Sequence, residues 1–468
     1  MSPAVTPGAC SGPTVVGSIA RTLLAAAAIG LSAVVVLACF MWLFFRLEGG
    51  QVRAEVRAAF ASGELVTNSG KLQDAHRGDY LFNDCLILQT LLLGRDDWRH
   101  SVIDSTIFLS DNPCLLLEQE ATGQPPTAAT YQYSRYLFAA RAVSGPLVAA
   151  LGVHGAKTML RLATYTLLVL SGCIALGALA RPSRLASHPP TLYFAGLLCT
   201  IALLGLYRLE FYAQTLAHGC SELVIATFLL FSMMPDKDAT AAGIPTAAIV
   251  LGVLTGCFEL LTGPSLVAVG IAVLLGHCAA PRAAQPYVRA ALVGMGCTAG
   301  ILMALFWQQL LISTLSDARP FYQFATHLAM RLQLHQFFAI PFEPQWAIPA
   351  NMHLYSPGEV IDAIGISLAS LAHGSRATAW FLFAGSALAI AAGPLFTRRE
   401  ARRGCVIAAA VGLSVPAWYF AFSNHTVLHS LYMIRMAVLL PLCAGVSLMF
   451  VFAPDAWMFP RETPFRAT

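Results

Sequence analysis

Charged residues are scarce in this sequence of 468 residues: they make up 11% of the chain, whereas hydrophobic residues make up 57%. A soluble domain usually carries about 25% charged residues. A chain this poor in charge cannot cover its own surface with groups that interact well with water. The composition therefore excludes a soluble globular enzyme and predicts an integral membrane protein.

Three further features are absent. No block of Lys and Arg occurs, because the net charge of +4 is spread over the loops, and nucleic-acid binding therefore has no support. No CxxC pair occurs among the twelve cysteines. No internal repeat is visible, which counts mildly against the transporter folds that are built from two related halves.

Long apolar stretches fill the chain instead. The clearest are 17 to 24 residues long and carry at most one charge each: Thr22–Phe45, Thr158–Ala180, Thr191–Tyr207, Ala377–Phe396 and Leu431–Phe452. A helix of that length crosses a hydrocarbon core of about 30 Å. The first stretch exceeds the 7–15-residue apolar region of a signal peptide, so we expect it to remain as the first membrane helix.

The positions of arginine predict the topology, because short cytoplasmic loops retain Lys and Arg. The loop from Thr397 to Gly404 holds four arginines and is placed inside, as are the loops with Arg181 and Lys237. Both termini then lie in the cytoplasm, and the number of spans is even. About ten helices in the plasma (inner) membrane fit best. The apolar run Ile244–Gly276 is predicted to form two short helices, broken at Gly263-Pro264, with an outer turn beside Glu259.

This topology gives an all-α polytopic membrane protein in five parts. They are a cytoplasmic N-terminus with the first helix (1–45), an outer loop with interfacial helices (46–157), a transmembrane bundle (158–306), a second outer loop (307–376) and C-terminal transmembrane helices (377–468). In the first outer loop we expect one amphipathic helix from residue 85, capped by Asn83 or Asp84, and another over Tyr131–Ala150. The second loop is interpreted as a cap over a site at the membrane surface.

Two cysteines, Cys85 and Cys114, share the large polar loop. A disulfide can form there if the loop faces an oxidising compartment; otherwise both are free thiols.

Ionisable residues in or near membrane helices are costly, so we take them as functional candidates. Asp84, and with less support Asp79, are candidates for a general base that removes a proton from an acceptor hydroxyl. The alternative is that Asp84 only caps its helix.

Arginine binds phosphate well because its planar guanidinium contacts two oxygens at once. Arg135, Tyr136 and Arg141 are therefore candidates for binding a lipid-linked phosphate. The alternative is that they only anchor an interfacial helix to lipid headgroups.

His218 and Glu222 are four residues apart and share a helix face, where they would bind a sugar hydroxyl or move a proton. A polar pair that packs two helices together is equally consistent. Glu259 stands alone among apolar residues and either belongs to the site or forms hydrogen bonds at the turn.

The last cluster is Asn424, His425 and His429, followed by Arg435. The two histidines share a face, and Asn424 and Arg435 align if the helix is continuous. His-x3-His is half of a metal site, but no third ligand is identifiable, so no metal site is predicted. Phosphate binding by Arg435 with histidine support is the preferred interpretation.

This arrangement resembles the GT-C superfamily of integral membrane glycosyltransferases, in which a first helix precedes a long, acid-rich outer loop and a helix bundle. Four segments resemble those of bacterial polytopic proteins associated with that superfamily: Asn83-Asp84-Cys85-Leu86, Tyr133-x-Arg135-Tyr136, Phe258-Glu259-Leu260-Leu261-Thr262 and Asn424-His425-Thr426-x-x-His429. The resemblance implies a GT-C bundle, a polyprenyl-phosphate sugar donor and an outer-loop carboxylate as base. The superfamily's acidic pair commonly follows the first helix closely, whereas that region of this chain offers only Glu48 and Glu55.

The sequence thus predicts transfer of a sugar from a polyprenyl-phosphate donor to a glycan or lipid-linked acceptor on the non-cytoplasmic face. No cofactor is predicted with certainty, and a divalent cation remains open. The alternatives are a cell-surface polysaccharide polymerase, a lipid-linked glycan translocator and a solute transporter.

Overall fold

The computed structural model describes most of the chain. The described residues are 15–47, 50–67, 75–93, 102–103, 105–108, 110, 112–133, 139–180, 188–234, 240–259, 263–281, 283–316, 319–338, 352–371 and 375–452.

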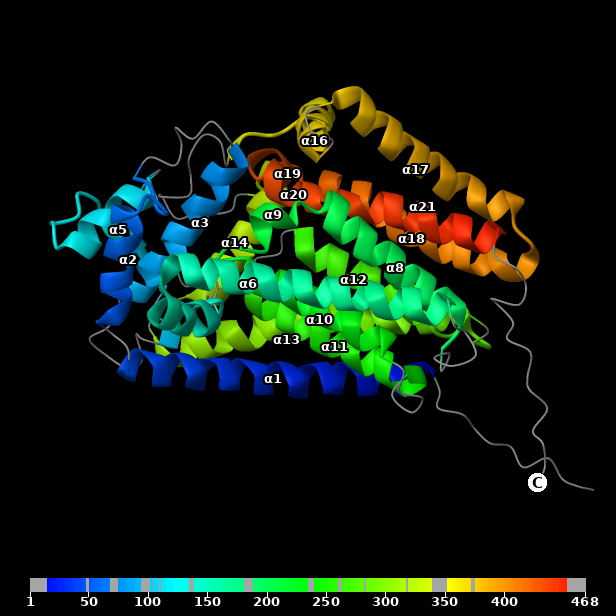
Figure 1. Ribbon diagram of the computed structural model, residues 1–468, viewed down its shortest axis with the longest axis horizontal. Helices are drawn as coiled ribbons and strands as arrows, with labels where there is room; N and C mark the ends of the chain where they lie inside the picture. The colour runs from blue at the N-terminus through cyan, green and yellow to red at the C-terminus, as the bar shows by residue number, and fades with distance from the viewer. Residues whose placement is uncertain are drawn as a thin grey trace, which may run out of the picture.

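Six helices are long and apolar enough to cross a membrane, which confirms a polytopic helical membrane protein. They lie roughly parallel to the longest dimension of the molecule, apart from the more tilted α17 (Figure 1). Their bounds are α1 (Val15–Leu47), α6 (Arg141–Ala180), α13 (Pro286–Leu315), α17 (Arg376–Phe396), α18 (Arg399–Ala421) and, after a short 3-10 turn η4 (Ile434–Val438), α21 (Leu439–Phe452).

Shorter apolar helices complete the bundle: α8 (Pro190–Leu206), α10 (Gly219–Met233), α11 (Thr240–Phe258) and α12 (Gly263–Cys278). The chain between Ile244 and Gly276 therefore forms two helices, as predicted, and Glu259 follows the first of them. The expected total of about ten spans stays a prediction.

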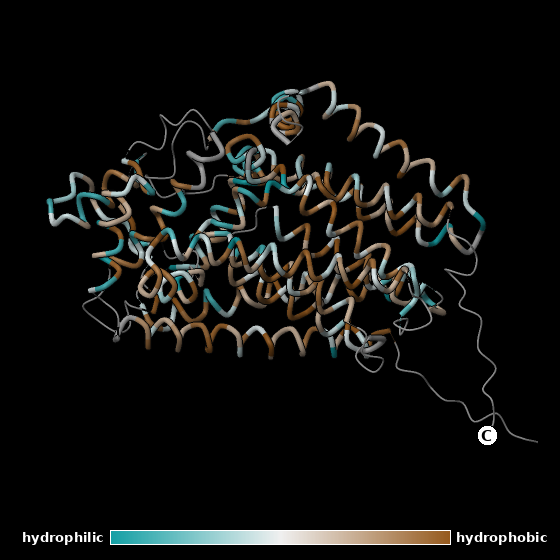
Figure 2. The backbone as a smooth tube through the Cα atoms, viewed as in Figure 1, coloured by the Kyte–Doolittle hydropathy of each residue, from teal (hydrophilic) through white to brown (hydrophobic). Residues whose placement is uncertain are grey.

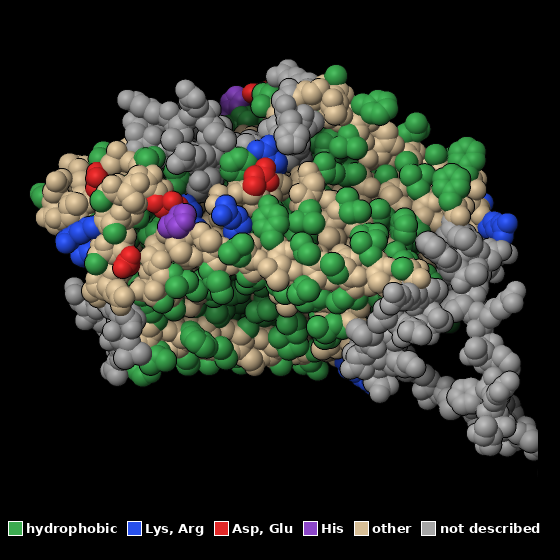
Figure 3. Space-filling view, in the orientation of Figure 1, with side chains coloured by type: hydrophobic (Ala, Val, Ile, Leu, Met, Phe, Trp, Pro, Cys, Tyr) green, Lys and Arg blue, Asp and Glu red, His purple; other side chains and the backbone are tan. Residues whose placement is uncertain are grey.

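Large apolar side chains cover the outside of the bundle. Phe381 on α17 is 84% exposed and Val16 on α1 is 76% exposed. Most of the tube through the bundle is coloured hydrophobic in Figure 2, and hydrophobic side chains cover the middle of the face shown in Figure 3. Such a surface is stable in lipid and costly in water, which explains the low charge content of the chain.

Close packing of α11 against α13 depends on glycines. A Cβ atom at Gly252 would lie 1.9 Å from the carbonyl oxygen of Cys297, and one at Gly300 would lie 2.5 Å from that of Ile249. Both glycines belong to G-x-x-x-G patterns, Gly252-x3-Gly256 and Gly296-x3-Gly300. Small residues at this spacing let two membrane helices approach closely, where burial of apolar surface from water cannot drive association.

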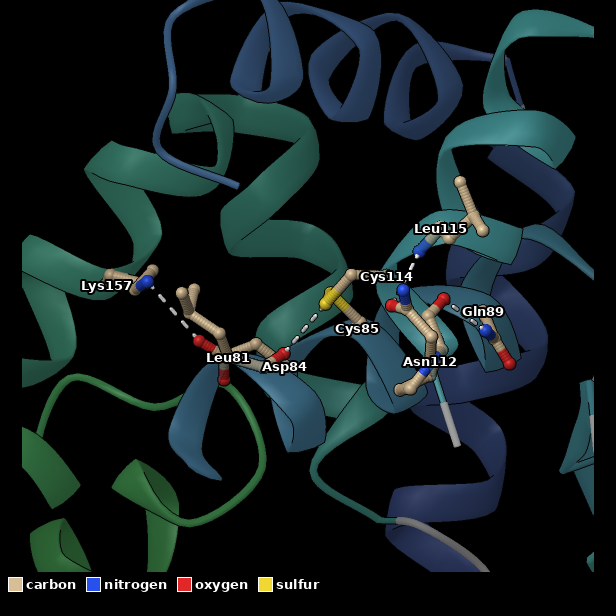
Figure 4. Close-up of a disulfide and its surroundings, with 9 residues drawn as sticks. Leu81, Asp84, Cys85, Gln89, Asn112, Cys114, Leu115 and Lys157 are labelled. Carbon is tan, nitrogen blue, oxygen red and sulfur yellow. Dashed lines mark hydrogen bonds and ion pairs between the residues drawn. A yellow bond between two sulfur atoms is a disulfide. The ribbon is translucent and has the colours of Figure 1, made fainter. Parts of the chain in front are cut away.

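A small polar unit forms one end of the molecule, at the left in Figure 1. It contains α2 (Gln51–Ala61), α3 (Ala75–Leu92), α5 (Pro113–Thr122) and the antiparallel strands β1 (Thr106–Phe108) and β2 (Thr130–Gln132). The disulfide between Cys85 and Cys114 joins α3 to α5 (Figure 4), and we call this the disulfide end. In Figure 1, α1 begins and α21 ends toward the opposite end.

Two details of the predicted helices in this region were wrong: the start of the helix that contains Cys85, and the start and break of the helix predicted over 131–150. Asp84 lies in the interior of α3 and caps nothing, because that helix begins at Ala75. The expected helix Tyr131–Ala150 is a strand at its start and becomes helical only from Arg141. The chain does not break at Gly145-Pro146; it departs from helical geometry at Gly152, where φ is +71°. Glycine tolerates that backbone conformation at little cost.

The segment that was predicted as the second outer loop begins later than expected, because α13 continues to Leu315 and Trp307 lies within it. The Trp307 indole donates a hydrogen bond to the carbonyl of Ala27 on α1, which fixes that end of α13 to the bundle. The described remainder contains α14 (Pro320–Arg331), the 3-10 turn η2 (Leu334–Gln336) and α16 (Pro357–Leu371).

The start of α16 carries a capping box. The Ser356 hydroxyl accepts a hydrogen bond from the Glu359 amide, and the Glu359 carboxylate accepts bonds from the amide and the hydroxyl of Ser356. These bonds, together with one from His353, lower the pKa of Glu359 to about 2. The helix packs against α19 (Ser423–Leu428), and Gln333 also donates a hydrogen bond to Ser423. The segment therefore lies against the residues around His425.

We predict that replacing Cys85 by Ser lowers the free energy of unfolding by roughly 2–4 kcal/mol, because the disulfide restricts the unfolded chain. Unfolding of the purified protein in mixed micelles, followed by intrinsic fluorescence, measures this loss. Cys39→Ser is the control, since Cys39 is a free and exposed cysteine on α1. Reaction of both Cys85 and Cys114 with maleimide in the denatured, unreduced protein would contradict the prediction.

Candidate functional site

Tyr432 lies at the centre of a group of polar and aromatic side chains from four parts of the chain. Its hydroxyl accepts a hydrogen bond from the Asn83 amide, 349 positions away in the sequence. Its ring centroid lies 5.2 Å from that of His218 and 5.8 Å from that of Tyr212. Tyr212 belongs to the short helix α9 (Leu209–Tyr212), and Tyr432 to α20 (Ser430–Met433). We call these residues, with Arg435, the Tyr432 cluster.

Arg435 is fully buried and is held from three sides. Its Nη1 lies 2.5 Å from Oε1 of Glu222, and its Nε donates to the Tyr432 carbonyl at 3.1 Å. The guanidinium carbon lies 4.3 Å from the centroid of the Tyr212 ring, a cation–π contact. A buried ion pair offsets the cost of its desolvation only when further hydrogen bonds satisfy its polar groups. Here the Tyr432 carbonyl supplies such a bond to Arg435.

Glu259 joins the end of α11 to the start of α10. One of its oxygens, Oε2, lies 3.3 Å from Nδ1 of His218 and accepts a hydrogen bond from the Ser221 hydroxyl at 3.1 Å. His218 and Glu222 were expected to act as a pair on one helix face. Each instead pairs with another segment, His218 with Glu259 and Glu222 with Arg435.

Asp84 is fully buried, and both its carboxylate oxygens are occupied. Oδ1 accepts a hydrogen bond from the Leu216 amide at 2.7 Å, and Oδ2 lies 3.3 Å from Nζ of Lys157 (Figure 4). Lys157 also contacts Glu64 at 3.1 Å. Although partial burial raises the pKa of the Glu64 carboxyl, Lys157 and His154 outweigh that effect and hold the pKa below its ordinary value.

Arg141 lies apart from the Tyr432 cluster. It is buried at the start of α6, and its Nη2 donates to the Val102 carbonyl at 2.9 Å while Nη1 contacts the Thr90 carbonyl at 3.4 Å. It therefore ties α6 to α3 and to the chain that follows α3. Arg135 and Tyr136 lie outside the described residues, and so does the side chain of Asp79, whose backbone belongs to α3.

The segment with Asn424, His425 and His429 is not one continuous helix with Arg435. It consists of α19, α20 and η4, and His429 interrupts it with φ −123° and ψ 37°. The predicted angular alignment of Asn424 with Arg435 therefore does not apply. The rings of His425 and His429 do share a face, with centroids 4.5 Å apart. The ring centroid of His429 lies 6.5 Å from that of Tyr432. Asn424 and His425 are buried, whereas His429 is exposed.

Three residues of this region were missed from the sequence: Lys157, Tyr212 and Tyr432. Lys157 was taken only as the boundary of an apolar run, although a lone lysine beside such a run is itself a signal for a buried acidic partner. The two tyrosines carry no pattern that separates them from membrane-interface aromatics. In the parts of the chain that the structure describes, no group of three His, Cys, Asp or Glu side chains is placed to hold a metal ion.

Comparison of the chain with protein-family models, curated proteins and solved structures finds no match.

We predict that Arg435→Met lowers the free energy of unfolding by about 3–5 kcal/mol, because it leaves the Glu222 carboxylate buried without its cation. The double variant Arg435→Met with Glu222→Met should recover part of this loss. Unfolding of the wild type, Arg435→Met, Glu222→Met and the double variant gives a double-mutant cycle.

The matched control is the ion pair of Arg208 with Glu210, whose glutamate side chain is 50% exposed. Arg208→Met should cost less than about 1 kcal/mol. Strictly additive losses for Arg435 and Glu222 would show that the pair does not couple these helices.

Proposed function

We propose that this protein is a membrane glycosyltransferase that transfers a sugar from a polyprenyl-phosphate donor to a glycan or lipid-linked acceptor on the non-cytoplasmic face. The observation that carries the proposal is the meeting of the His218–Glu259 pair, Arg435 and two tyrosines in the Tyr432 cluster. These are the groups that such a reaction needs: a base, a cation for the phosphate and aromatic faces for the sugar.

The disulfide supports an outer location for the disulfide end, because disulfides persist in oxidising compartments. The arginine-rich segment at 397–404, which the structure shows as the turn before α18 and the first residues of α18, would then face the cytoplasm. A ten-span arrangement fits both assignments: the six long helices supply six spans, and α8, α10, α11 and α12 would supply four. We place the protein in the plasma (inner) membrane on this basis.

In the proposed reaction His218 acts as the base. Its Nδ1 faces Glu259, so the carboxylate would hold the imidazole in the tautomer that leaves Nε2 to accept a proton. Among the described residues Nε2 of His218 has no hydrogen-bond partner. Asp84, the base predicted from the sequence, has both oxygens occupied, and the proposal therefore does not use it as a base.

The bonds change in one displacement. The acceptor hydroxyl gives its proton to Nε2 of His218 as its oxygen bonds to the anomeric carbon of the donor sugar. The bond between that carbon and the phosphate oxygen breaks, and the lipid phosphate leaves as an anion. A phosphate anion is a weakly basic leaving group, so the step needs no general acid. Arg435 is paired with Glu222, so it would contribute to phosphate binding by sharing its guanidinium between that carboxylate and the phosphate. Arg135 is a further phosphate ligand predicted from the sequence.

A polymerase of lipid-linked glycans is the second candidate, since it would use the same arginine and aromatic contacts on pyrophosphate-linked repeat units. The two differ in the donor that they consume, and donor choice therefore distinguishes them.

We predict that the purified protein in lipid nanodiscs transfers labelled sugar from polyprenyl-phosphate-linked glucose, mannose or arabinose to a glycan acceptor. His218→Asn should lower kcat at least about 100-fold with little change in KM, because the lost group acts mainly in the transition state. His353→Asn is the control, because this side chain is 52% exposed and pairs with Glu359 at the start of α16 rather than with a residue of the Tyr432 cluster.

Transfer only from pyrophosphate-linked repeat units would favour the polymerase. Full activity of His218→Asn would remove His218 as the base, and the absence of transfer from every donor would refute the proposed function.

A further inference from the structure

Ion pairs form a continuous series from the surface to the interior at the disulfide end. His154 Nδ1 lies 3.1 Å from one oxygen of Glu64, and Lys157 Nζ lies 3.1 Å from the other. The same lysine nitrogen lies 3.3 Å from Oδ2 of Asp84 (Figure 4). The exposed fraction of these side chains falls from 77% for His154 to 25% for Glu64, 3% for Lys157 and 0% for Asp84.

The series continues through the backbone toward His218. Asp84 accepts a hydrogen bond from the Leu216 amide, and the Leu216 carbonyl accepts one from the Ser144 hydroxyl at 2.7 Å. Both backbone polar groups of Leu216 are therefore fixed by residues of α3 and α6. Two residues later, the His218 amide donates to Thr215 Oγ1 at 2.9 Å, which closes the turn that directs the imidazole to Glu259.

Lys157 is the shared partner of two carboxylates in this series. Without it, the fully buried Asp84 carboxylate would keep its hydrogen bond from the Leu216 amide but lose its ion pair, and a buried charge without a counter-charge is strongly unfavourable. Lys157 thus favours the ionised form of Asp84 against the burial that raises the pKa of this carboxyl, and it orients the group that holds the turn 215–218.

We propose that Lys157 is a positioning residue for the reaction at His218. It acts through Asp84 and the turn 215–218, and it touches neither donor nor acceptor. This inference rests on the proposed function for its kinetic part only; the ordering of the turn by Lys157 stands independently of any activity.

The experiment compares the full-length protein with Lys157→Met, Lys157→Arg, Asp84→Asn and the double variant Lys157→Met with Asp84→Asn, all in nanodiscs. Arg161→Met is the matched control, because it removes a positive charge one turn further along α6 and outside the series. Hydrogen–deuterium exchange of the segment 213–222 is measured first, and sugar transfer from the polyprenyl-phosphate donors second.

We expect Lys157→Met to raise exchange in 213–222 about tenfold or more, because the Leu216 hydrogen bond loses a fixed acceptor. It should lower kcat about tenfold or more with less than a twofold change in KM, since displacement of a reacting group raises the barrier without weakening binding. Lys157→Arg should restore most of the wild-type kcat and most of the protection of 213–222 from exchange. Arg161→Met should match the wild type in both measurements.

The double variant should be no worse than Asp84→Asn alone, because the two residues act in series. Unchanged exchange in Lys157→Met, or additive effects in the double variant, would overturn the proposal. If Lys157→Met does not fold, Asp84→Ala decides, because alanine cannot accept the Leu216 hydrogen bond, and wild-type exchange in that variant overturns the proposal. A wild-type protein without transfer activity refutes the proposed function, while the exchange data still decide the ordering of the turn.

Discussion

Buried charge in this apolar bundle is matched by charge or by a polar partner, and the arrangement of the candidate site follows from that constraint. A carboxylate or guanidinium away from water is unfavourable unless its partner lies within hydrogen-bonding distance. Asp84 with Lys157, Glu222 with Arg435 and Glu259 with His218 each satisfy this condition. Each pair joins different helices, so the need to neutralise charge also fixes which helices meet.

The helix bundle and the disulfide end meet this constraint in different ways. Between the ends, packing of small residues such as those of α11 and α13 holds the helices together without polar groups. Toward the disulfide end, ion pairs and hydrogen bonds add to the apolar packing of α2, α3 and α5 against α6. The contacts of Asn83 and Asp84 further connect α3 to the residues around His218.

The differences between expectation and structure have local physical causes. The residues from Ala75 to Asn83 are too polar to predict a helix from periodicity, yet α3 starts there. The strand at Thr130–Gln132 exists because it pairs with Thr106–Phe108, a partner that no local pattern reveals. The break at His429 likewise places α19, α20 and η4 in separate orientations, whereas their apolar composition fits one continuous helix.

The sequence by itself determined the membrane character, the two-helix nature of the run from Ile244 to Gly276 and the set of rare ionisable residues, because low charge and long apolar runs are properties of composition and length. It brought His218, Glu222, Glu259 and Arg435 forward as candidates but assigned the partners of the first two incorrectly. Only the tertiary structure decided that His218 faces Glu259, that Glu222 faces Arg435 and that Lys157 reaches Asp84. Pairing of buried charges depends on distances between helices, and those distances arise only when the whole bundle packs.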